Sequence, residues 1–407
     1  MEEFGLSSRG AANVAAIWPL ISKAVEERKQ TASPVIDMAT SENFLLRDEL
    51  ITFFKTAVCD GLQSCHFSYP NELNGDRALL KSVATFLNTH FRPSIPVESQ
   101  HIIVAPGVTF TLDALLYNLF EAGDGILIPT PCWMNVRSGV QPVWGPVDTL
   151  DHVFEPSKAI QSLELAVSQS TCPIKGLLLT NPHNPLGRNY DTEMLRDLVR
   201  FCHRKRIHFI SNEIYAMSSF ARSGTPFTSA LQLDFRGMGC DPSQVHTLWG
   251  ISKDLGSNGL RMGCCVTQAN KPLATGLALS SNTQLSSLTA LVTTKLLTSP
   301  ELPRLLEINS QRLGEAYTVM TGWLDAHALP YVAATTGCFV FARLAPHAQT
   351  WEEEAAVIDA WKQAGVSVSA GRSYHAPETA KGWARISFAL PPAVLSEALR
   401  RLDLVSR

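Results

Sequence analysis

The segment Trp249-Gly-Ile-Ser-Lys253-Asp-Leu-Gly-Ser-Asn-Gly-Leu-Arg261 tells more about the fold and chemistry of this chain than any other stretch. Lys253 stands directly after Ser252, and Arg261 follows beyond a turn that contains glycine. A lysine amine forms a Schiff base with an aldehyde, and an arginine holds a phosphate. The spacing therefore suits a cofactor that carries both groups. Each half of the pattern also occurs by chance, so the rest of the chain has to supply the remainder of a pocket.

Outward from this segment, short apolar runs alternate with helical periods. We expect helices over 109–121 and 192–205, and later strands near Cys338 to Arg343 and Ala384 to Phe388. The strands expected in the middle of the chain are 101–105, 125–128, 176–180, 207–210, 245–248 and 262–266. Strands separated by helices predict an α/β fold with a mostly parallel central sheet and helices on both faces. We expect a large domain over residues 58–290 and a smaller α+β domain formed by residues 1–57 and 291–407.

Polar segments follow several of these strands directly. They are Gly107, Asn181 to Gly187, Asn212 to Tyr215, and Lys253. Because ligands of such sheets bind beyond the carboxyl ends of the strands, these segments predict one shared site.

Two of these segments suit the binding of a phosphorylated ring. Gly107-Val108-Thr109 lies between a strand and a helix, where free backbone N–H groups bind anions. An ordinary strand-to-helix turn is the alternative reading. In Asn181-Pro-His-Asn184-Pro-Leu-Gly187 the prolines and the glycine make a rigid loop, from which Asn184 can donate a hydrogen bond. A purely structural asparagine turn is the alternative there.

Three further side chains are candidates with ordinary alternatives. Trp133, after Pro129-Thr-Pro131, can stack on a planar ring, although most tryptophans belong to a core. Tyr215 can hydrogen-bond a cofactor oxygen, as buried tyrosines also do structurally. Arg385, in Trp383-Ala-Arg-Ile-Ser-Phe388, can clamp a carboxylate, although a surface arginine on a strand is the commoner case.

Composition excludes several classes of protein. The net charge of -3 gives no reason to expect nucleic acid as a partner, and no apolar run is long enough to span a membrane. Nine cysteines occur without a C-x-x-C pair, which indicates reduced thiols rather than disulfides or a metal site. The acidic start lacks the basic region of a secretory signal. We therefore expect a cytoplasmic protein without a bound metal.

Over nearly the whole chain, the motifs resemble those of the fold type I pyridoxal phosphate (PLP) enzymes of aminotransferase class I/II. Within that family the chain is most similar to the 1-aminocyclopropane-1-carboxylate (ACC) synthase branch. Four segments carry this likeness: Ser41-Glu42-Asn43, Ser252 to Gly256, Asn184 to Gly187, and Ser281 to Gln284. A further resemblance, to which Leu6 to Asn13 contributes, points to fungal carbon–sulfur lyases of epidithiodiketopiperazine pathways.

The resemblance implies a role for each candidate residue. Lys253 binds PLP and moves the substrate's Cα proton, and Ser252 lies beside it in the cofactor site. Arg261 with the backbone of Val108 and Thr109 holds the phosphate. Trp133 stacks on the ring, while Asn184 and Tyr215 contact the ring oxygen. Arg385 grips the substrate carboxylate.

Two more residues bear on substrate binding and assembly. Glu42 matches a glutamate that lies near the substrate, with a cap or loop hydrogen bond as its ordinary alternative. Tyr69 corresponds to a tyrosine that reaches into a neighbouring subunit's site, although its spacing to Gly75 is one residue longer than expected. The resemblance also implies a homodimer with shared active sites.

The chain departs from the family pattern at Asn212, where the pattern has aspartate. An asparagine can hydrogen-bond the ring nitrogen of the cofactor but contributes no charge, so the ring is a weaker electron acceptor. Two smaller departures are Gly250 in place of a serine and Asn258 in place of a proline, which together suggest a looser hold on the phosphate.

A weaker acceptor favours β-elimination, in which a leaving group at Cβ takes the electrons. We therefore expect a PLP-dependent lyase that cleaves the C–S bond of a cysteine-derived conjugate in secondary metabolism. An aminotransferase acting on amino acids, an ACC-synthase-like γ-displacement, and a PLP-binding protein without catalysis are the alternatives.

Overall fold

A computed structural model describes residues 35–133, 139–221 and 223–404, together with scattered positions between 5 and 22. Half of the segment Leu6 to Asn13, which contributes to one resemblance, therefore lies outside the described residues. None of the helices in the described part is both long and apolar enough to cross a membrane.

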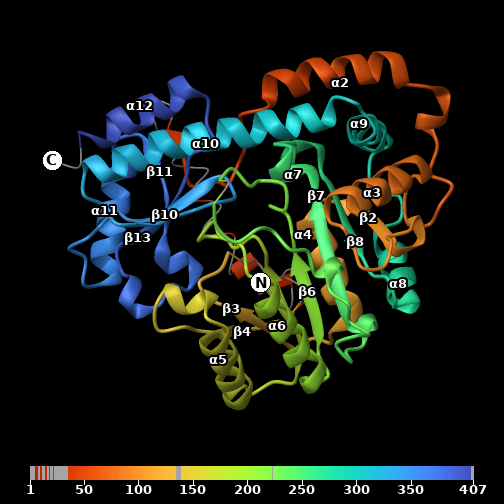
Figure 1. Cartoon of the computed structure of the whole chain (residues 1–407), viewed down its shortest axis with the longest axis horizontal. Helices are drawn as coiled ribbons and strands as arrows, with labels where there is room; N and C mark the ends of the chain where they lie inside the picture. The colour runs from red at the N-terminus through yellow and green to blue at the C-terminus, as the bar shows by residue number, and fades with distance from the viewer. Residues whose placement is uncertain are drawn as a thin grey trace.

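The centre of the molecule is a seven-stranded sheet (Figure 1). Only β8 is antiparallel to its neighbours, β2 and β7, and the other pairings are parallel. This confirms the predicted α/β fold with a mostly parallel sheet. In spatial order the strands are β2 (Ile102–Pro106), β8 (Met262–Val266), β7 (Val245–Gly250), β6 (His208–Asn212), β5 (Ile174–Thr180), β3 (Gly125–Pro129) and β4 (Gln141–Gly145).

The sequence analysis missed the edge strand β4. Its residues, Gln-Pro-Val-Trp-Gly, lack the apolar run of the inner strands, and its first two side chains are exposed. A proline is tolerated here because an edge strand leaves some backbone N–H groups unpaired.

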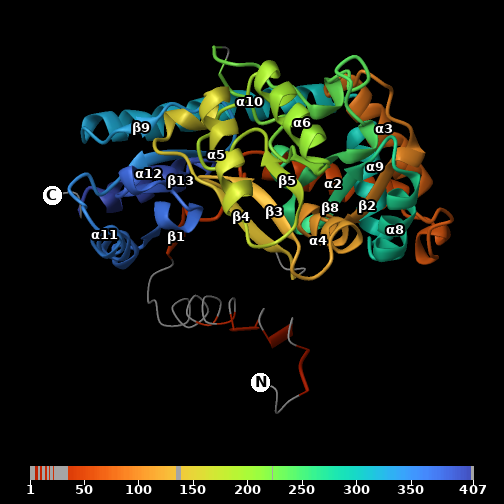
Figure 2. The same cartoon turned by 90° about the horizontal axis from the view of Figure 1, so that it is seen from below.

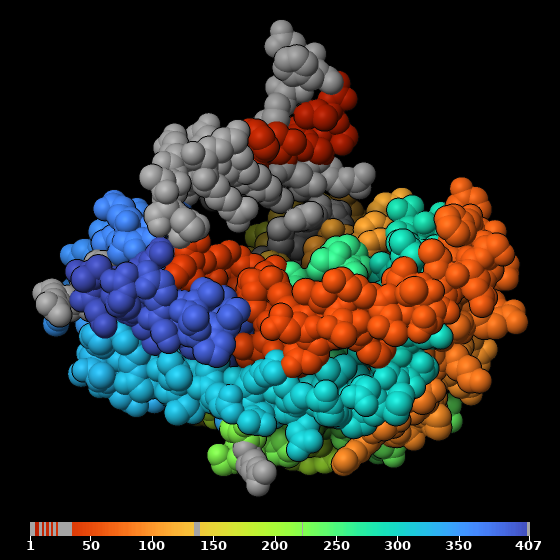
Figure 3. All heavy atoms as spheres, turned by 90° about the horizontal axis from the view of Figure 1, so that it is seen from above, coloured from red at the N-terminus to blue at the C-terminus, as the bar shows by residue number. Residues whose placement is uncertain are grey.

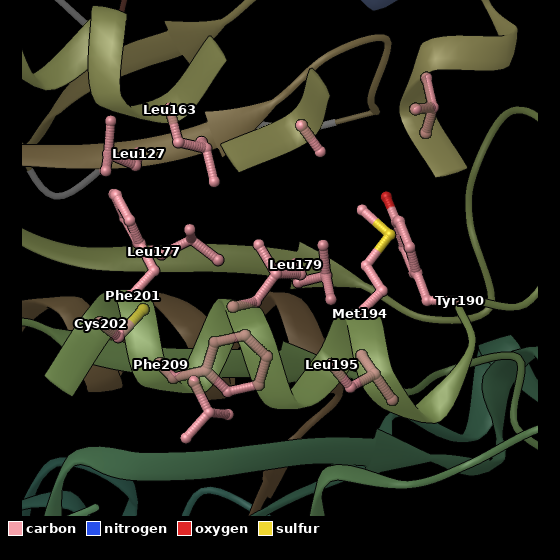
Figure 4. Packing of buried hydrophobic residues seen from close by; sticks show 14 of the residues in the cluster. Leu127, Leu163, Leu177, Leu179, Tyr190, Met194, Leu195, Phe201, Cys202 and Phe209 are labelled. Carbon is pink, nitrogen blue, oxygen red and sulfur yellow. The ribbon is translucent and has the colours of Figure 1, made fainter. Parts of the chain in front are cut away.

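Helices cover both faces of the sheet (Figure 2). Leu177 and Leu179 of β5 point to one face, where they pack with Leu195 and Phe201 of α6 (Figure 4). Leu178, between them in the chain, packs on the other face with residues of α4 and α8. This alternation follows from the two-residue period of a strand. The helices on the first face are α5 (Pro156–Gln169) and α6 (Thr192–Lys205), and those on the second are α4 (Val108–Leu119) and α8 (Lys271–Ser281).

A third group of helices packs beside β2, β7 and β8. Trp249, at the end of β7, is fully buried and stacks on Phe86 with ring centroids 4.5 Å apart. The short helix α7 (Ile251–Asp254) follows Trp249 and carries Lys253. The helices of this group are α2 (Arg47–Gly61), α3 (Arg77–His90) and α9 (Ser287–Leu297).

The C-terminal part contains two small sheets. In the first, β10 (Phe339–Arg343) pairs with β9 (Tyr331–Val332) and β13 (Trp383–Ser387), which also pairs with β12 (Ser369–Ala370). The second pairs β1 (Ile36–Asp37) with β11 (Val366–Ser367), so the N-terminal segment joins the C-terminal one. The helices around these sheets are α10 (Leu302–Ala326), α11 (Trp351–Gln363) and α12 (Pro392–Leu402).

The long helix α10 runs beside α2 along one side of the molecule (Figure 3). An ion pair between Arg312 and Glu49, 2.6 Å apart, joins the two helices. The strands expected near Cys338 to Arg343 and Ala384 to Phe388 are present as β10 and β13. The boundary of the two domains, at residues 57/58 and 290/291, stays a prediction.

Candidate active site

Lys253 lies just beyond the carboxyl end of β7. Its Nζ atom donates a hydrogen bond to the backbone carbonyl of Ser41, which approaches from the N-terminal segment. Burial lowers the pKa of Lys253, and the positive charges of Arg385 and Arg261 lower it further. A buried amine with a lowered pKa is a stronger candidate nucleophile than an exposed lysine, because more of it is uncharged near neutral pH.

A set of buried hydrogen bonds holds the turn that carries Lys253. Asp254 accepts from Ser218 Oγ at 2.6 Å and from Trp249 Nε1 at 3.0 Å. Asn309 Nδ2 donates to the backbone oxygen of Asp254 at 3.1 Å, and Asn309 Oδ1 accepts from Asn43 Nδ2 at 2.7 Å. Burial raises the pKa of Asp254 to about 7. The aspartate next to the lysine therefore acts as the structural anchor of this turn.

A glycine cradle and an arginine lie together at the start of α4. Gly107 has a φ of 85°, in the region that favours glycine, and Val108 and Thr109 are the first residues of the helix. Arg261 donates to the carbonyl of Pro106 at 3.2 Å. A Cβ atom on Gly107 would lie only 2.4 Å from an Arg261 nitrogen. The cradle and the arginine thus meet only because residue 107 has no side chain.

The structure also accounts for the two smaller departures. A Cβ atom on Gly250 would lie 2.6 Å from the carbonyl oxygen of Met262, so a serine requires the neighbouring strand to shift. Asn258 donates through Nδ2 to Glu42, while its backbone oxygen accepts from Arg261 at 2.7 Å. Glu42 is also paired with Arg47, at 3.2 Å. Asn258 therefore connects Glu42 with Arg261.

Asn212 is the last residue of β6, and its side-chain oxygen is buried. Within the described part of the chain this Oδ1 atom has no hydrogen-bond partner. The neighbouring carboxylate of Glu213 is fully buried but well paired: it accepts from Ser211 Oγ, Ser229 Oγ and Ala230 N at 2.5 to 2.8 Å. Burial raises the pKa of Glu213 to about 7. A buried polar atom that lacks a partner costs free energy, so Asn212 marks a place where a ligand atom is expected.

Arg385 extends from β13 into the same region and is only 3% exposed. It donates to Asn184 Oδ1 at 2.9 Å and to the carbonyl of Ala39 at 2.6 Å. Its Nε atom is buried without a partner among the described residues. The burial rules out the surface-arginine reading, and the contact with Asn184 rules out a purely local role for that asparagine.

Tyr215 is buried, and its hydroxyl lies 2.9 Å from Ser41 Oγ. Burial raises the pKa of Tyr215, so the phenol keeps its proton. Ser41 therefore contacts both Tyr215, through its side chain, and Lys253, through its carbonyl.

Trp133, Ser252 and Tyr69 occupy different surroundings. Trp133 is 48% exposed, which contradicts the core reading, and its backbone N–H donates to the carbonyl of Asn184 at 3.3 Å. Ser252 is buried beside Lys253. Tyr69 is 82% exposed and lines a separate groove of about 950 Å³, together with residues of 281–294. Within this chain, Tyr69 is thus the predicted site residue that is not brought to the others.

Sequence comparisons agree with this geometry. Residues 34–402 match the family model described as "Aminotransferase class I and II". The chain belongs to this family. It is 50% identical over 411 residues to "Probable aminotransferase aclI" of Aspergillus oryzae, with 98% of each chain covered. It is 31% identical to the mouse "1-aminocyclopropane-1-carboxylate synthase-like protein 1", covering 89% of this chain and 74% of that one.

The fold has close counterparts among solved structures. Aspartate aminotransferase from Thermus thermophilus superposes with a TM-score of 0.78 at 21% identity, over 98% of this chain and 99% of that one. The resemblance to fold type I PLP enzymes, including ACC-synthase-like and fungal members, is confirmed. The chain is a PLP-dependent enzyme.

The residues present fit this cofactor. Asn212 Oδ1, which has no partner among the described residues, can accept a hydrogen bond from a protonated ring nitrogen, and the start of α4 at Gly107 brings backbone N–H groups beside Arg261 for a phosphate. Lys253 supplies a buried amine that interacts electrostatically with Arg261 and Arg385.

The sequence analysis gave no role to Ser41, Cys338, Asp254 or Asn309. Ser41 and Cys338 come from segments far from Lys253 in the chain, and only folding brings them together. The structural role of Asp254 could have been inferred from the sequence. A charged residue next to a candidate nucleophile in an apolar stretch has to be paired once it is buried.

Proposed function

We propose that this enzyme is a carbon–sulfur β-lyase that acts on a cysteine-derived conjugate in fungal secondary metabolism. Its products are a thiol, ammonia and a keto acid or its equivalent. The observation that carries the proposal is Asn212, whose neutral amide stands at the end of β6 with a buried, unpartnered oxygen.

PLP, when bound, supplies an aldehyde that combines with amines and a ring that draws electrons from the bonds at Cα. We assign the binding of its phosphate to Arg261 and the backbone of Val108 and Thr109. Trp133 and Ser252 complete the cofactor site in this assignment, and Asn184 and Tyr215 contact the ring oxygen.

In the proposed reaction, Lys253 takes the Cα proton of the substrate. The C–S bond breaks, its electron pair leaves on sulfur, and the thiolate picks up a proton. Water then releases ammonia and the keto acid from the remaining fragment. Arg385 holds the substrate carboxylate through paired N–H groups, and Glu42 lies near the substrate.

Asn212 decides between the reactions that such a site supports. A carboxylate at this position would place a negative charge beside the ring nitrogen, whereas the amide offers a neutral hydrogen bond. A charge-assisted hydrogen bond contributes about 1.5–3 kcal/mol and a neutral one about 0.5–1.5 kcal/mol. The difference, about one pKa unit or more, weakens the electron acceptor. Elimination tolerates this better than transamination, because the departing sulfur takes the electrons.

An aminotransferase is the second candidate. Its support is the name of the relative from Aspergillus oryzae, a probable aminotransferase that is 50% identical to this chain. An ACC-synthase-like γ-displacement is disfavoured by Asn212, since it also needs a strong electron acceptor. A PLP-binding protein without catalysis is disfavoured because Lys253, Arg261, Asn184 and Arg385 are all present.

We further propose a cytoplasmic homodimer. All nine cysteines carry free thiols, which suits a reducing compartment. Tyr69 is exposed on the rim of a groove away from Lys253, as expected of a side chain that serves a second subunit.

A product assay on the PLP-loaded protein tests the proposed reaction. The protein is mixed with an S-substituted cysteine or with ordinary amino acids, and thiol, ammonia, keto acid and pyridoxamine phosphate are followed together. Thiol and ammonia released while the cofactor stays as PLP support the lyase. Pyridoxamine phosphate accumulating with keto acid, and no thiol, makes the enzyme an aminotransferase.

A further inference from the structure

Three buried side chains form a hydrogen-bonded chain next to Lys253. The Oγ atom of Ser41 lies 2.9 Å from the hydroxyl of Tyr215 and 3.0 Å from the Sγ atom of Cys338. The three residues are 5%, 3% and 2% exposed, respectively. They come from the segment before α2, the loop after β6, and the residue before β10. Because all three are almost fully buried, their protons are shared mainly among these side chains or with the site.

The number of available protons determines which group donates and which accepts in this hydrogen-bonded chain. Tyr215 has a single O–H, so if it donates a hydrogen bond to Ser41 it cannot also donate one to a cofactor oxygen. Ser41 also has a single O–H and two neighbours. If the thiol of Cys338 donates to Ser41 Oγ, the Ser41 hydroxyl is free to donate to Tyr215. The Tyr215 proton then points into the site.

The chemistry of the thiol supports this direction. Burial raises the pKa of Cys338, which therefore keeps its proton and remains a donor. A thiol sulfur is a weak acceptor, so Ser41 gains more by donating to the phenol oxygen than to sulfur.

We propose that Cys338 is a positioning residue of the cofactor site, which acts through Ser41 to direct the proton of Tyr215 toward the cofactor oxygen. The proposal rests on the role assigned to Tyr215 above. Cys338 donates to Ser41, Ser41 donates to Tyr215, and Tyr215 donates to the cofactor. The carbonyl of Ser41 meanwhile accepts the hydrogen bond from Lys253 Nζ, so one residue holds both the tyrosine and the lysine.

Several ionisable groups face this chain from other elements, and all of them contribute to its electrostatics. Arg385 of β13 and Tyr374 face Tyr215, while Lys253 and Asp254 of α7 face Cys338. Glu42 bears on Lys253. The variants below change none of these groups, so differences between variants report on the chain itself.

The test is a pH titration of the visible absorbance of PLP-loaded protein without substrate. A hydrogen bond donated to the cofactor oxygen favours the deprotonated form, and therefore lowers the pH midpoint. Tyr215→Phe should raise the midpoint most. Cys338→Ala should raise it by about half a unit to one unit, because Ser41 then competes for the Tyr215 proton. Cys338→Ser, which keeps a donor, should stay near the wild-type midpoint.

Ser41→Ala separates this proposal from a packing effect. It removes the group that competes for the Tyr215 proton, so the midpoint should not rise. Adding Cys338→Ala to Ser41→Ala should then change nothing further, because the thiol acts only through Ser41. If Cys338→Ala acted through a loss of packing, it would shift the pH midpoint equally in the wild-type protein and in Ser41→Ala. That result would overturn the proposal.

A second pair of variants keeps the test decisive if the double variant does not fold. Cys338→Val and Cys338→Thr have similar sizes, but only the threonine can donate. Equal midpoints in these two proteins would also overturn the proposal. Because no substrate is present, these outcomes are independent of whether the enzyme is a lyase or an aminotransferase.

Discussion

Selected buried polar groups at the two ends of the central sheet differ in whether they have hydrogen-bond partners. At the amino ends of β6 and β7, His208 Nδ1 lies 3.0 Å from His246 Nε2, and His246 Nδ1 lies 3.1 Å from Thr267 Oγ1. Burial lowers the pKa of His246 to about 3, so the pair stays neutral near pH 7. At the carboxyl ends, Asn212 Oδ1 and Arg385 Nε are buried without partners in the described part of the chain.

The difference separates structural polar groups from those that await a ligand. Most buried groups that stabilise the fold are hydrogen-bonded, because each unmade bond costs about 1–3 kcal/mol. Thr247 Oγ1 of β7 also lacks a partner among the described residues, so a missing partner indicates a ligand-binding group only where other candidate site residues lie beside it. Both ends contain buried titratable side chains, so burial and a shifted pKa do not by themselves identify the site.

The largest expected effect is at Lys253. Lys253→Ala should replace the Schiff-base absorbance of the bound cofactor with that of the free aldehyde and lower turnover by at least about 10³-fold, because the proposed covalent anchor and proton carrier are lost. Absorbance and a product assay measure this. Lys55→Ala, an exposed lysine on α2, is the control. If Lys253→Ala kept the Schiff-base absorbance and the activity, the carboxyl end of β7 would not be the reaction centre.

Glu213 lies at the carboxyl end of the sheet, but its carboxylate is hydrogen-bonded to protein groups. It therefore tests whether a buried group at this end that is already paired contributes to stability, as the paired groups at the amino end do. Its pKa is raised by burial from 4.5 to about 7, so the folded protein favours the protonated form. The resulting stability is present below about pH 4.5 and is lost as the pH rises through 7. Its size is up to about 3 kcal/mol.

Glu213→Gln should therefore flatten the fall in unfolding free energy between pH 4.5 and 7, as measured by urea unfolding at a series of pH values. Asp254, whose pKa is shifted in the same direction, should account for the remaining slope. Glu307→Gln, an exposed position on α10, should keep the wild-type slope. An equally steep fall in Glu213→Gln would contradict the prediction.

Arg385 tests one of the unpaired groups directly. Arg385→Ala should raise KM for amino acids with a free carboxylate by about 10- to 100-fold, with a smaller change in kcat, because a charge-assisted hydrogen bond is lost. Initial rates measure this, with Arg304→Ala on α10 as an exposed control. An unchanged KM would mean that the natural substrate has a blocked carboxylate or that Arg385 has another role.

Asn212 tests the other unpaired group. Asn212→Asp should raise the ratio of pyridoxamine phosphate to thiol by about tenfold, because a carboxylate strengthens the electron acceptor by about one pKa unit. Asn189→Asp adds a carboxylate at another buried asparagine and should leave this ratio unchanged. A ratio that stays the same or falls in Asn212→Asp would remove the argument for elimination.

The smallest effect is expected at the amino ends of the strands. Thr267→Val removes the hydrogen bond to His246 and should lower the unfolding free energy by about 1 kcal/mol, with no change in the visible spectrum. Thr275→Val, an exposed threonine on α8, is the matched control. A spectral shift in Thr267→Val would show that the two ends are coupled.

Much of the fold could be predicted from the sequence because its signals are local. Several inner strands are nearly continuous apolar runs that are buried, as in β3, whereas the exposed edge strand β4 has no such run and was missed. The residues around Lys253 were predictable for the same reason, since strand, turn and nucleophile are adjacent in the chain.

Sequence alone determined the family and the cofactor and showed that Asn212 departs from the family pattern, because these depend on which residues stand in which order. Only the tertiary structure decided which groups are paired. Ser41, Tyr215 and Cys338 lie in three distant segments, and Arg385 reaches Asn184 across 201 positions of the chain. A hydrogen bond forms only within about 3.5 Å. The pairing of buried polar groups, and hence the difference between the two ends of the sheet, therefore exists only once the chain has folded.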